Sequence, residues 1–526
     1  MFTTIAIFSV ALQPCAAAVD TAPPPGIVPT GITLREVLAH HRTAIGTPAV
    51  GKPDTRRETW TYTRGDLAGT QTTVSSGDDF REDTTLGPFK TARGSYHGRR
   101  WEENENGLIV DLTGLHERDS VDGAALHESL ITPHGVTLLG EAASPSASYV
   151  VRVEPAGGRL EYVFYDKTTF LITRIERLID GQRVVETYDD FRAVAGVTEA
   201  WHLHTSDGRR YNDEDWEMQS LVVGTPSDDA ALHPPDPRGS AMFSSTQGTL
   251  PAHIVDDRVI VTTQINGRAV ILQLDSGAAG ILLDRSVADA LKLPIYGKQT
   301  QTTAGTYVAN DAVIPTMTIG PVTLHDVAVQ TAPFHGWAGT PISGLLGFDF
   351  IDQCVVHVDY ANDRVEVFAP GSFTAPSGAI SLAIRLDDRV PALAAKIAST
   401  RADAFILDTG ADRSMLFSNF TLEHPGAITD QGLGEEITAA FPFVGSFSGV
   451  GGEVQVRPTQ VQSLGIETIS LPNWLFYVTQ HAPGFEIEDV DGLIGQDVLR
   501  NFDLYLDYPH LKIYLVPNSR YHSRWG

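Results

Sequence analysis

Two acidic tripeptides carry the residue types best suited to chemistry in this chain. Asp275-Ser276-Gly277 follows the apolar run at residues 269–274, and Asp408-Thr409-Gly410 follows the apolar run at residues 404–407. A carboxylate at the end of a buried strand lies in a protected pocket, and the glycine lets the backbone turn closely there. The serine or threonine hydroxyl can hydrogen-bond across to the other copy of the motif. The motifs therefore predict two buried carboxylates, Asp275 and Asp408, supported by Ser276, Gly277, Thr409 and Gly410.

Each acidic motif belongs to a duplicated segment. Residues 344–349 (GLLGFD) align with residues 492–497 (GLIGQD) at an offset of 148, and this alignment continues to the Asp-Tyr pairs that begin at Asp359 and Asp507. The acidic motifs align at an offset of 133, so the second copy has 15 additional residues between its two motifs. Two separate motifs that repeat in the same order indicate one structural unit present twice, with one loop enlarged.

This paired arrangement resembles the retropepsin and pepsin families of aspartic peptidases over residues 250–517. The resemblance implies a mainly β, bilobal acid-protease fold made of two pseudo-symmetric, retropepsin-like β-barrel units. Unit 1 would be residues 250–370 and unit 2 residues 378–517, joined in one chain as a pseudo-dimer. The resemblance also implies that Gly347 and Gly495 end the strands that pass beside the two acidic loops.

The resemblance further implies that Asp275 and Asp408 are catalytic. Two carboxylates a few ångströms apart do not both ionise readily, so one holds a proton while the other is charged, as is known for aspartic peptidases. The charged carboxylate takes a proton from a lytic water, and the protonated one hydrogen-bonds to the carbonyl oxygen of the peptide. This chemistry requires no metal and no organic cofactor. The sequence leaves open which aspartate carries the proton.

Two glycine-rich segments lie between the motifs, at Thr303–Tyr307 in unit 1 and at residues 445–452 in unit 2. The family resemblance implies flaps here that close over an extended substrate and exclude water. Tyr307 would be the flap aromatic, and Gly305 and Gly451 would lie at the tips. The other interpretation is that both segments are ordinary hairpin turns.

Other polar residues have simpler interpretations. Asp349 and Asp497 follow the second motif and are expected to cap the short helices that begin there, not to act in catalysis. His202 and His204 alternate on a strand and point to one face. No third residue with metal-ligand spacing accompanies them, so no metal site is expected. The absence of HExxH, CxxC, P-loop and GxSxG motifs from the sequence excludes most other hydrolase classes.

A separate block precedes unit 1, at residues 30–232. Thr33 and Glu36 have the spacing of a capping box at the start of a helix. After them, short runs rich in β-formers alternate with turn signals and predict a curved antiparallel sheet, with one or two helices in the block. The run from Tyr165 to Val197 resembles the LolA-type periplasmic lipoprotein carriers, which implies an incomplete β-barrel.

Length and composition fit this division. The 526 residues are too many for one compact core, and Pro/Gly/Ser-rich stretches at residues 233–251 and 369–378 are interpreted as linkers. A net charge of -27 excludes a nucleic-acid surface, because the phosphate backbone would be repelled. No stretch beyond the amino terminus reaches roughly 18 consecutive apolar residues, so no membrane span is expected.

The amino terminus predicts export. Residues 5–12 are apolar and the alanines at 16–18 fit a signal-peptidase site, so residues 1–18 are interpreted as a signal peptide and the protein as periplasmic or secreted. No lysine or arginine precedes the apolar run, which departs from the usual pattern. Cys15 has poor neighbours for lipidation. Cys354 would be the only cysteine of the mature chain, which excludes an intramolecular disulfide.

Three functions are consistent with these features. The leading hypothesis is an aspartic endopeptidase that acts on polypeptide and is active as a monomer, because one chain supplies both carboxylates. The first alternative is an inactive peptidase-like scaffold that binds peptides, because a fold does not imply its chemistry. The second alternative is a lipid or lipoprotein carrier based on residues 30–232, because a curved, half-open sheet can hold an acyl chain.

Overall fold

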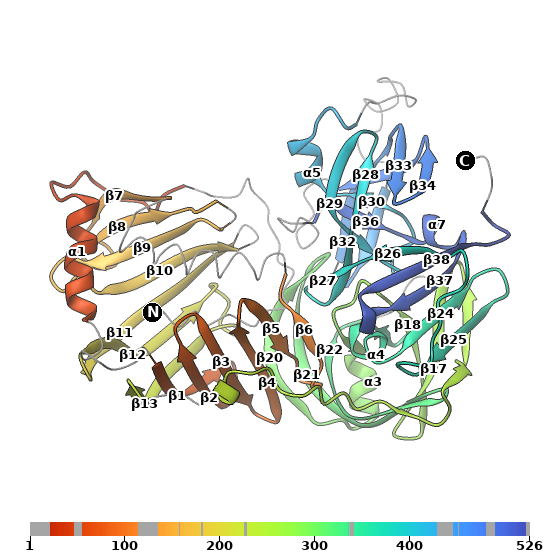
Figure 1. The fold of residues 1–526 in the computed structure, drawn as a ribbon, viewed down its shortest axis with the longest axis horizontal. Coiled ribbons are helices and arrows are strands. Elements are labelled where there is room, and N and C mark those ends of the chain that lie inside the picture. Colours follow the sequence, from red (N-terminus) through yellow and green to blue (C-terminus); the bar gives the residue numbers. More distant parts are fainter. Residues whose placement is uncertain are drawn as a thin grey trace.

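The computed structural model describes most of the chain, and Figure 1 shows its arrangement. The described residues are 22–46, 55–113, 135–156, 158–179, 182–225, 229–334, 336, 341–428, 445–450, 452–479 and 490–521. Strands account for 57% and helices for 9% of the structure, which confirms the expected mainly β class. A large open sheet from the first part of the chain lies beside a second body built from the rest.

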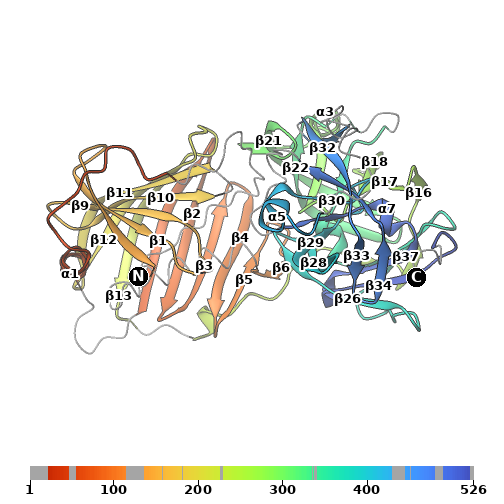
Figure 2. The ribbon, with the colours of Figure 1, turned by 90° about the horizontal axis from the view of Figure 1, so that it is seen from above.

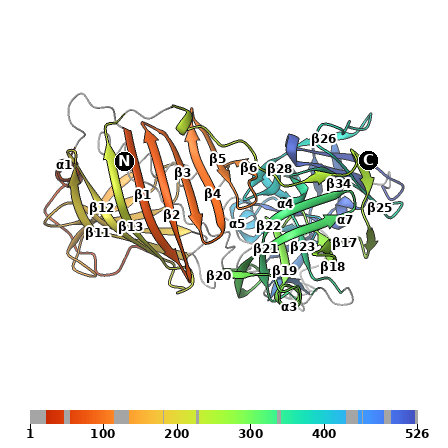
Figure 3. The same ribbon diagram turned by 90° about the horizontal axis from the view of Figure 1, so that it is seen from below.

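The first part of the chain forms one 13-stranded sheet, called the N-terminal sheet below. Its order is β6-β5-β4-β3-β2-β1-β13-β12-β11-β10-β9-β8-β7, with antiparallel neighbours, as the alternating β-formers and turns predict. The strands are β1 (Thr55–Arg64), β2 (Leu67–Ser76), β3 (Asp79–Leu86), β4 (Phe89–Tyr96), β5 (Arg99–Glu103), β6 (Ile109–Asp111), β7 (Val136–Ala142), β8 (Ser148–Val153), β9 (Glu161–Asp166), β10 (Ile172–Ile179), β11 (Gln182–Val194), β12 (Val197–Ser206) and β13 (Glu214–Val223). Strands β5 and β6 form the edge that faces the second body (Figures 2 and 3).

Helix α1 (Leu34–Ile45) lies against the opposite end of the N-terminal sheet (Figure 1). The hydroxyl of Thr33 accepts from the amide of Glu36 at 3.3 Å, and the Glu36 carboxylate accepts from the amide of Thr33 at 2.8 Å. The predicted capping box is therefore confirmed. The buried Val37 and Leu38 pack against apolar side chains of β8, β9 and β10, which anchors the helix to the sheet.

Unit 1 contains a 9-stranded mixed sheet of order β14-β22-β19-β23-β18-β17-β21-β20, with β16 paired to β17. Its strands are β14 (Met242–Phe243), β16 (Ala252–Val255), β17 (Arg258–Ile265), β18 (Arg268–Leu274), β19 (Ile281–Asp284), β20 (Ile295–Thr302), β21 (Thr306–Ile319), β22 (Val322–Ala332) and β23 (Gly344–Leu346). The short helices are α3 (Arg285–Ala290) and α4 (Phe348–Ile351), and η1 (Asp229–Ala231) precedes the unit.

Unit 2 contains a 10-stranded sheet of order β31-β32-β35-β30-β36-β29-β28-β33-β34, with β27 paired to β28. Its strands are β27 (Arg385–Asp387), β28 (Val390–Ile397), β29 (Thr400–Leu407), β30 (Met415–Leu416), β31 (Gly445–Gly449), β32 (Gly452–Gln460), β33 (Ser463–Ile466), β34 (Ile469–Pro472), β35 (Leu475–Thr479) and β36 (Gly492–Ile494). Its helices are α5 (Ser418–Glu423), α7 (Gln496–Leu499) and η2 (Tyr508–His510).

The two units share a third sheet, of order β15-β25-β24-β37-β38-β26. Its strands are β15 (Gln247–Thr249), β24 (Val355–Asp359), β25 (Arg364–Phe368), β26 (Ile380–Ala383), β37 (Phe502–Asp507) and β38 (Lys512–Pro517). At its centre Val356 pairs with Leu506 and Val358 pairs with Leu504. Because these positions exchange under the offset of 148, the contact is isologous and the units are related by a local two-fold axis.

The stretch at residues 233–251 is more than the linker that its composition predicts. It contributes β14, which pairs with β22, and β15, which pairs with β25. Proline and glycine mark where the chain turns, but short strands between turns still add to the edge of an existing sheet. The segment therefore adds one strand to the 9-stranded sheet of unit 1 and one strand to the sheet that the two units share.

Candidate active site

Asp275 and Asp408 lie at equivalent places in the two units. Each follows a central strand, β18 or β29, that pairs in parallel with the short strand of the second motif, β23 or β36. The amide of Asp275 donates to the carbonyl of Leu346 at 3.0 Å, and the amide of Asp408 donates to the carbonyl of Ile494 at 2.9 Å. The second motif of each unit therefore holds the backbone at the base of each acidic loop.

The side chains of Ser276 and Thr409 cross between the two loops. The hydroxyl of Thr409 accepts from the amide of Ser276 at 2.9 Å, and the hydroxyl of Ser276 accepts from the amide of Thr409 at 2.9 Å. Each hydroxyl also donates to a carbonyl of the opposite strand, at Leu407 and Leu274. Both residues are buried, so these four hydrogen bonds fix the separation of the two loops.

The glycines of both motifs are required by close approach. A Cβ atom on Gly277 would lie 2.6 Å from Cγ of Asp408, and one on Gly410 would lie 2.5 Å from Cγ of Asp275. Real Cβ atoms do not approach heavy atoms this closely. Each glycine amide also donates to the carboxylate of its own loop, at 2.9 Å for Gly277 and 2.6 Å for Gly410. The carboxyls are thus oriented by backbone amides and face each other.

The two carboxyls share one proton. Burial, then the charge of Asp408 and the side-chain hydrogen bond between the two groups, raise the pKa of Asp275 well above its usual value. Burial also raises the pKa of Asp408, but the amide of Gly410 and the hydrogen bond from Asp275 oppose that rise. Burial and mutual repulsion therefore disfavour two ionised carboxyls, and the pair favours a state with one shared proton.

Gly347 and Gly495 end the strands that run beside the acidic loops. A Cβ atom on Gly347 would lie 2.5 Å from the carbonyl oxygen of Gly280, and one on Gly495 would lie 2.6 Å from the carbonyl carbon of Arg413. Both glycines therefore permit the second motif to pass directly under the loop after each aspartate.

The expectation that Asp349 and Asp497 cap helices is wrong. The positions before α4 and α7 are Gly347 and Gly495, and neither helix has a side-chain cap. Both aspartates lie one residue inside their helix and are buried, and their carboxylates accept hydrogen bonds from the loops that follow the acidic motifs. The position of each aspartate near the start of a short helix is typical of a capping residue, but the local sequence does not show the strand and loop that pack over the helix.

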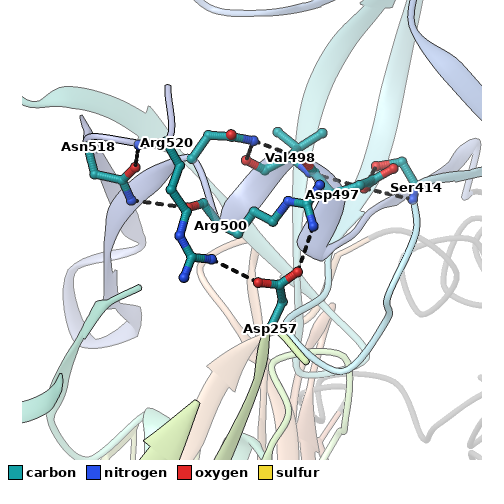
Figure 4. A network of polar contacts seen from close by, with 8 residues as sticks. Asp257, Ser414, Asp497, Val498, Arg500, Asn518 and Arg520 are labelled. Atoms are coloured by element: carbon teal, nitrogen blue, oxygen red, sulfur yellow. Dashed lines mark hydrogen bonds and ion pairs between the residues drawn. The ribbon is translucent and has the colours of Figure 1, made fainter. Parts of the chain in front are cut away.

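In unit 2 this support is visible in Figure 4. The carboxylate of Asp497 accepts from the amide of Ser414 at 3.0 Å and from its hydroxyl at 2.7 Å. Beside it, Asp257 of unit 1 accepts from Arg500 at 2.7 Å and from Arg520 at 2.8 Å. These ion pairs tie the β16–β17 turn of unit 1 to the end of α7 in unit 2.

The two glycine-rich segments form hairpin tips that touch each other. The tip between β20 and β21 places the hydroxyl of Thr303 in a hydrogen bond with the carbonyl of Val450, at the tip between β31 and β32. A Cβ atom on Gly452 would lie 2.7 Å from the carbonyl oxygen of Ala304. Tyr307 and Val450 pack against the same buried apolar cluster as Ala278, the residue after Gly277. Gly305 is part of this tip, and Gly451 lies outside the described residues.

The remaining candidates lie elsewhere. His202 and His204 pair with the carboxylates of Asp189 at 3.0 Å and Asp215 at 2.8 Å on the N-terminal sheet. Within the described ranges no three His, Cys, Asp or Glu side chains are grouped as a metal site would need. Cys354 is buried and forms no disulfide within the described residues. Residues 1–18, including Cys15, lie outside the described residues, and the part that is described holds no helix with the length and apolarity to cross a membrane.

Comparison with protein families gives a match to part of unit 1. The family model described as aspartyl protease matches residues 261–350, a range that contains Asp275 and Gly347. The chain therefore contains an aspartyl protease family domain. No curated protein matches the chain.

Solved structures resemble the N-terminal region. A DUF1329 family protein from Desulfovibrio piger has 14% identity and a TM-score of 0.28, and the alignment covers 38% of this chain and 95% of that one. A LolA superfamily protein from Nitrosomonas europaea has 11% identity and a TM-score of 0.30, covering 39% and 99%. A domain titled as an outer membrane lipoprotein-sorting protein, from Vibrio parahaemolyticus, has 10% identity and a TM-score of 0.28, covering 38% and 95%.

Proposed function

We propose that the chain is an aspartic endopeptidase in which Asp275 and Asp408 activate one water molecule. The crossed hydrogen bonds of Ser276 and Thr409 carry this proposal, because they hold two buried carboxyls from different units against each other. A structural pair of turn aspartates would have no need of a shared proton. In this proposal units 1 and 2 together form a bilobal acid-protease fold.

In this proposal the two carboxyls take different roles. Charged Asp408 takes a proton from the water as the water oxygen attacks the peptide carbonyl carbon. Protonated Asp275 donates a hydrogen bond to the carbonyl oxygen and stabilises the charge that develops there. The tetrahedral intermediate then collapses, the C–N bond breaks, and the amine leaves with a proton from the dyad. No metal or organic cofactor takes part in these steps.

Two apolar clusters beside the dyad support an extended polypeptide as substrate. Leu282 and Leu345 belong to a buried cluster in unit 1, and the equivalent Met415 and Leu493 belong to one in unit 2. Ala278 and Ala411, directly after the two acidic motifs, each pack against one cluster. A peptide that crosses the dyad beneath the touching hairpins would place apolar side chains on both sides of the scissile bond. The hairpins then act as flaps, not as ordinary turns.

The peptidase proposal is tested by cleavage of a diverse peptide library by the purified chain, with products identified by mass spectrometry. The Asp275→Asn/Asp408→Asn double variant is the control for contaminating peptidases. Cleavage that requires both aspartates supports the proposal. A wild-type chain that binds library peptides without cleaving them supports the inactive scaffold instead.

The carrier alternative draws no support from one cavity of the N-terminal sheet. This cavity, between α1 and the strands, has a volume of about 70 Å³ and is lined by His41, Arg56, Glu58 and Glu199 besides apolar residues. A buried water needs roughly 10–15 Å³ on this scale, so the space holds a few waters and not an acyl chain. Lipid that copurifies with the intact protein would reverse this conclusion. The proposed setting of the peptidase is outside the cytoplasm, as the leader at residues 1–18 predicts.

A further inference from the structure

Asp349 and Asp497 occupy equivalent positions but receive their hydrogen bonds from different parts of the chain. Strand pairing fixes the equivalence: Leu282 pairs with Leu345 in unit 1 as Met415 pairs with Leu493 in unit 2. One residue before Leu282 is Ile281, and one residue before Met415 is Ser414. Unit 2 therefore has a hydroxyl where unit 1 has an aliphatic side chain.

In unit 2 the donors to Oδ1 of the Asp497 carboxylate come from within the unit. Ser414 donates to Asp497 through both its amide and its hydroxyl, and the hydroxyl accepts from the amide of Gly495 at 3.1 Å. In unit 1 the amide of Ile281 donates to Oδ2 of Asp349 at 3.1 Å, but Ile281 has no hydroxyl to act as a second donor to the carboxylate. A buried carboxylate oxygen without a donor is costly.

The missing donor comes from the N-terminal sheet. Asn104, in the turn between β5 and β6, donates from Nδ2 to Oδ1 of Asp349 at 2.9 Å, and both residues are buried. Oδ1 of Asn104 accepts from the amides of Asn106 and Leu108, both at 3.0 Å. Because two amides occupy the oxygen, the orientation of the side-chain amide is fixed and Nδ2 must face Asp349.

The turn that carries Asn104 is inserted firmly into the second body. Leu108 and Val110 belong to the same buried core as the strands of units 1 and 2. The buried Arg389 of unit 2 donates to Glu102 at 3.1 Å, and Asn106 exchanges two hydrogen bonds with the backbone of Ala328 in β22. The donor is therefore presented on a rigid support. Figures 2 and 3 show β5 and β6 at this junction.

Asp349 in turn holds the loop that carries Asp275. Besides the bond from Ile281, a Cβ atom on Gly280 would lie 2.8 Å from Oδ2 of Asp349, so the loop passes directly over the carboxylate. The amide of Phe348 donates to the carbonyl of Ala278 at 3.0 Å. Any shift of Asp349 is thus transmitted to residues 278–281, three positions after Asp275.

We propose that Asn104 is a positioning residue for the active site: it supplies a side-chain hydrogen bond to Asp349 in unit 1, on the oxygen that the Ile281 amide leaves free, and so has the role that the Ser414 hydroxyl has toward Asp497 in unit 2. The N-terminal sheet is then part of the peptidase scaffold and not an appended module. This inference rests on the proposed peptidase function for its kinetic consequence, but its structural consequence is independent of activity.

The test uses the full chain and three variants. Asn104→Ala removes the donor. Asn104→Ala/Ile281→Thr adds a hydroxyl at the position that Ser414 has in unit 2, on a side chain that keeps the β-branched shape. Thr113→Val is the matched control, because Thr113 donates to Asp387 at the same junction without contacting Asp349. The measurements are kcat and KM on a cleaved peptide, and amide hydrogen exchange of residues 276–283.

We expect kcat of Asn104→Ala to fall roughly ten-fold with KM unchanged, because a buried acceptor loses its partner while the hairpin tips and apolar clusters remain. Exchange of residues 276–283 should become faster. The double variant should recover part of both losses, because the added hydroxyl restores a side-chain donor to the Asp349 carboxylate, and Thr113→Val should match the wild type in both measurements.

Two results would overturn the inference. One is an Asn104→Ala variant with wild-type kcat and exchange. The other is an equal loss of kcat in Asn104→Ala and Thr113→Val without recovery in the double variant. That result would mean that the β5–β6 turn only attaches the N-terminal sheet to the second body and does not position Asp349. If the wild type cleaves no peptide, the proposed function fails, and exchange alone decides: faster exchange reversed by Ile281→Thr supports the positioning role, and unchanged exchange refutes it.

Discussion

The amide of Ser276 donates to the hydroxyl of Thr409 at 2.9 Å, and the amide of Thr409 donates to the hydroxyl of Ser276 at the same distance. This reciprocity shows that the two acidic loops meet across the local two-fold axis that relates the units. The site therefore depends on both units, and a change in either acidic loop should alter the positions of both carboxyls.

Thr409→Val tests the crossed hydrogen bonds. Valine has the shape of threonine but leaves the amide of Ser276 and the carbonyl of Leu274 buried without partners, so the free energy of unfolding should fall by about 2 to 5 kcal/mol. Thr409→Ser keeps the hydroxyl and should stay close to the wild type. Urea denaturation measures both. Equal stability of Thr409→Val and Thr409→Ser would show that the bonds contribute nothing.

Asp275→Asn and Asp408→Asn should each abolish cleavage. Each removes a group that must share the proton, and burial disfavours the charge, so neither amide should lower the melting temperature. Asp326→Asn, at an exposed position of strand β22 in unit 1, is the matched control and should remain fully active. Turnover near the wild-type level in either single variant would contradict a one-site mechanism.

Activity per molecule should not depend on protein concentration. Both carboxyls come from one chain, and units 1 and 2 are joined by the shared sheet of β24 and β37. Initial rates over a wide dilution series, compared with the mass measured by light scattering, check this. A specific activity that collapses in step with dissociation of a dimer would mean that units pair between chains.

The pH dependence of the rate should respond to the residues after each glycine. Ala278 and Ala411 give their backbone amides to the carboxylates but no hydroxyl. A donor to a carboxylate favours its charged form and lowers its pKa, so the proton-sharing state of the wild type should persist to a mildly acidic or near-neutral pH. Ala278→Ser and Ala411→Ser should each move the basic limb of the pH-rate profile downward. A limb that stays in place while activity is retained would refute this role.

The stability of the protein should depend on pH through Asp352, which directly follows helix α4. Burial, then the charge of Asp349, raises the pKa of Asp352 to about 7. A raised pKa contributes stability below the unfolded value of 3.8, and this contribution is lost as the pH rises through 7. Asp352→Asn should therefore raise the melting temperature at pH 8 and leave it unchanged near pH 3, where both side chains are neutral. The exposed Asp326→Asn serves as control, and a gain of equal size at both pH values would contradict the assignment.

The sequence by itself determined the parts of the site that repeat. Asp275 and Asp408 each follow an apolar run, and Gly347 and Gly495 recur at a constant offset, so the pairing of two loops follows from the duplication. The β-rich class and the capping box at Thr33 also follow from local patterns, because strand alternation and helix capping involve near neighbours in the chain.

Only the tertiary structure shows the contacts that the repeated sequence motifs do not encode. Asp349 was expected to cap a helix, yet its carboxylate is held by Asn104, 245 residues earlier in the chain. Residues 242–249 were expected to be a linker, yet they add two strands to the sheets of the second body. Burial, the charge of Asp408 and the hydrogen bond between the two carboxyls raise the pKa of Asp275, and only the packed structure supplies these interactions. Contacts between residues so distant leave no local periodicity or motif, because they depend on which surfaces meet when the whole chain packs.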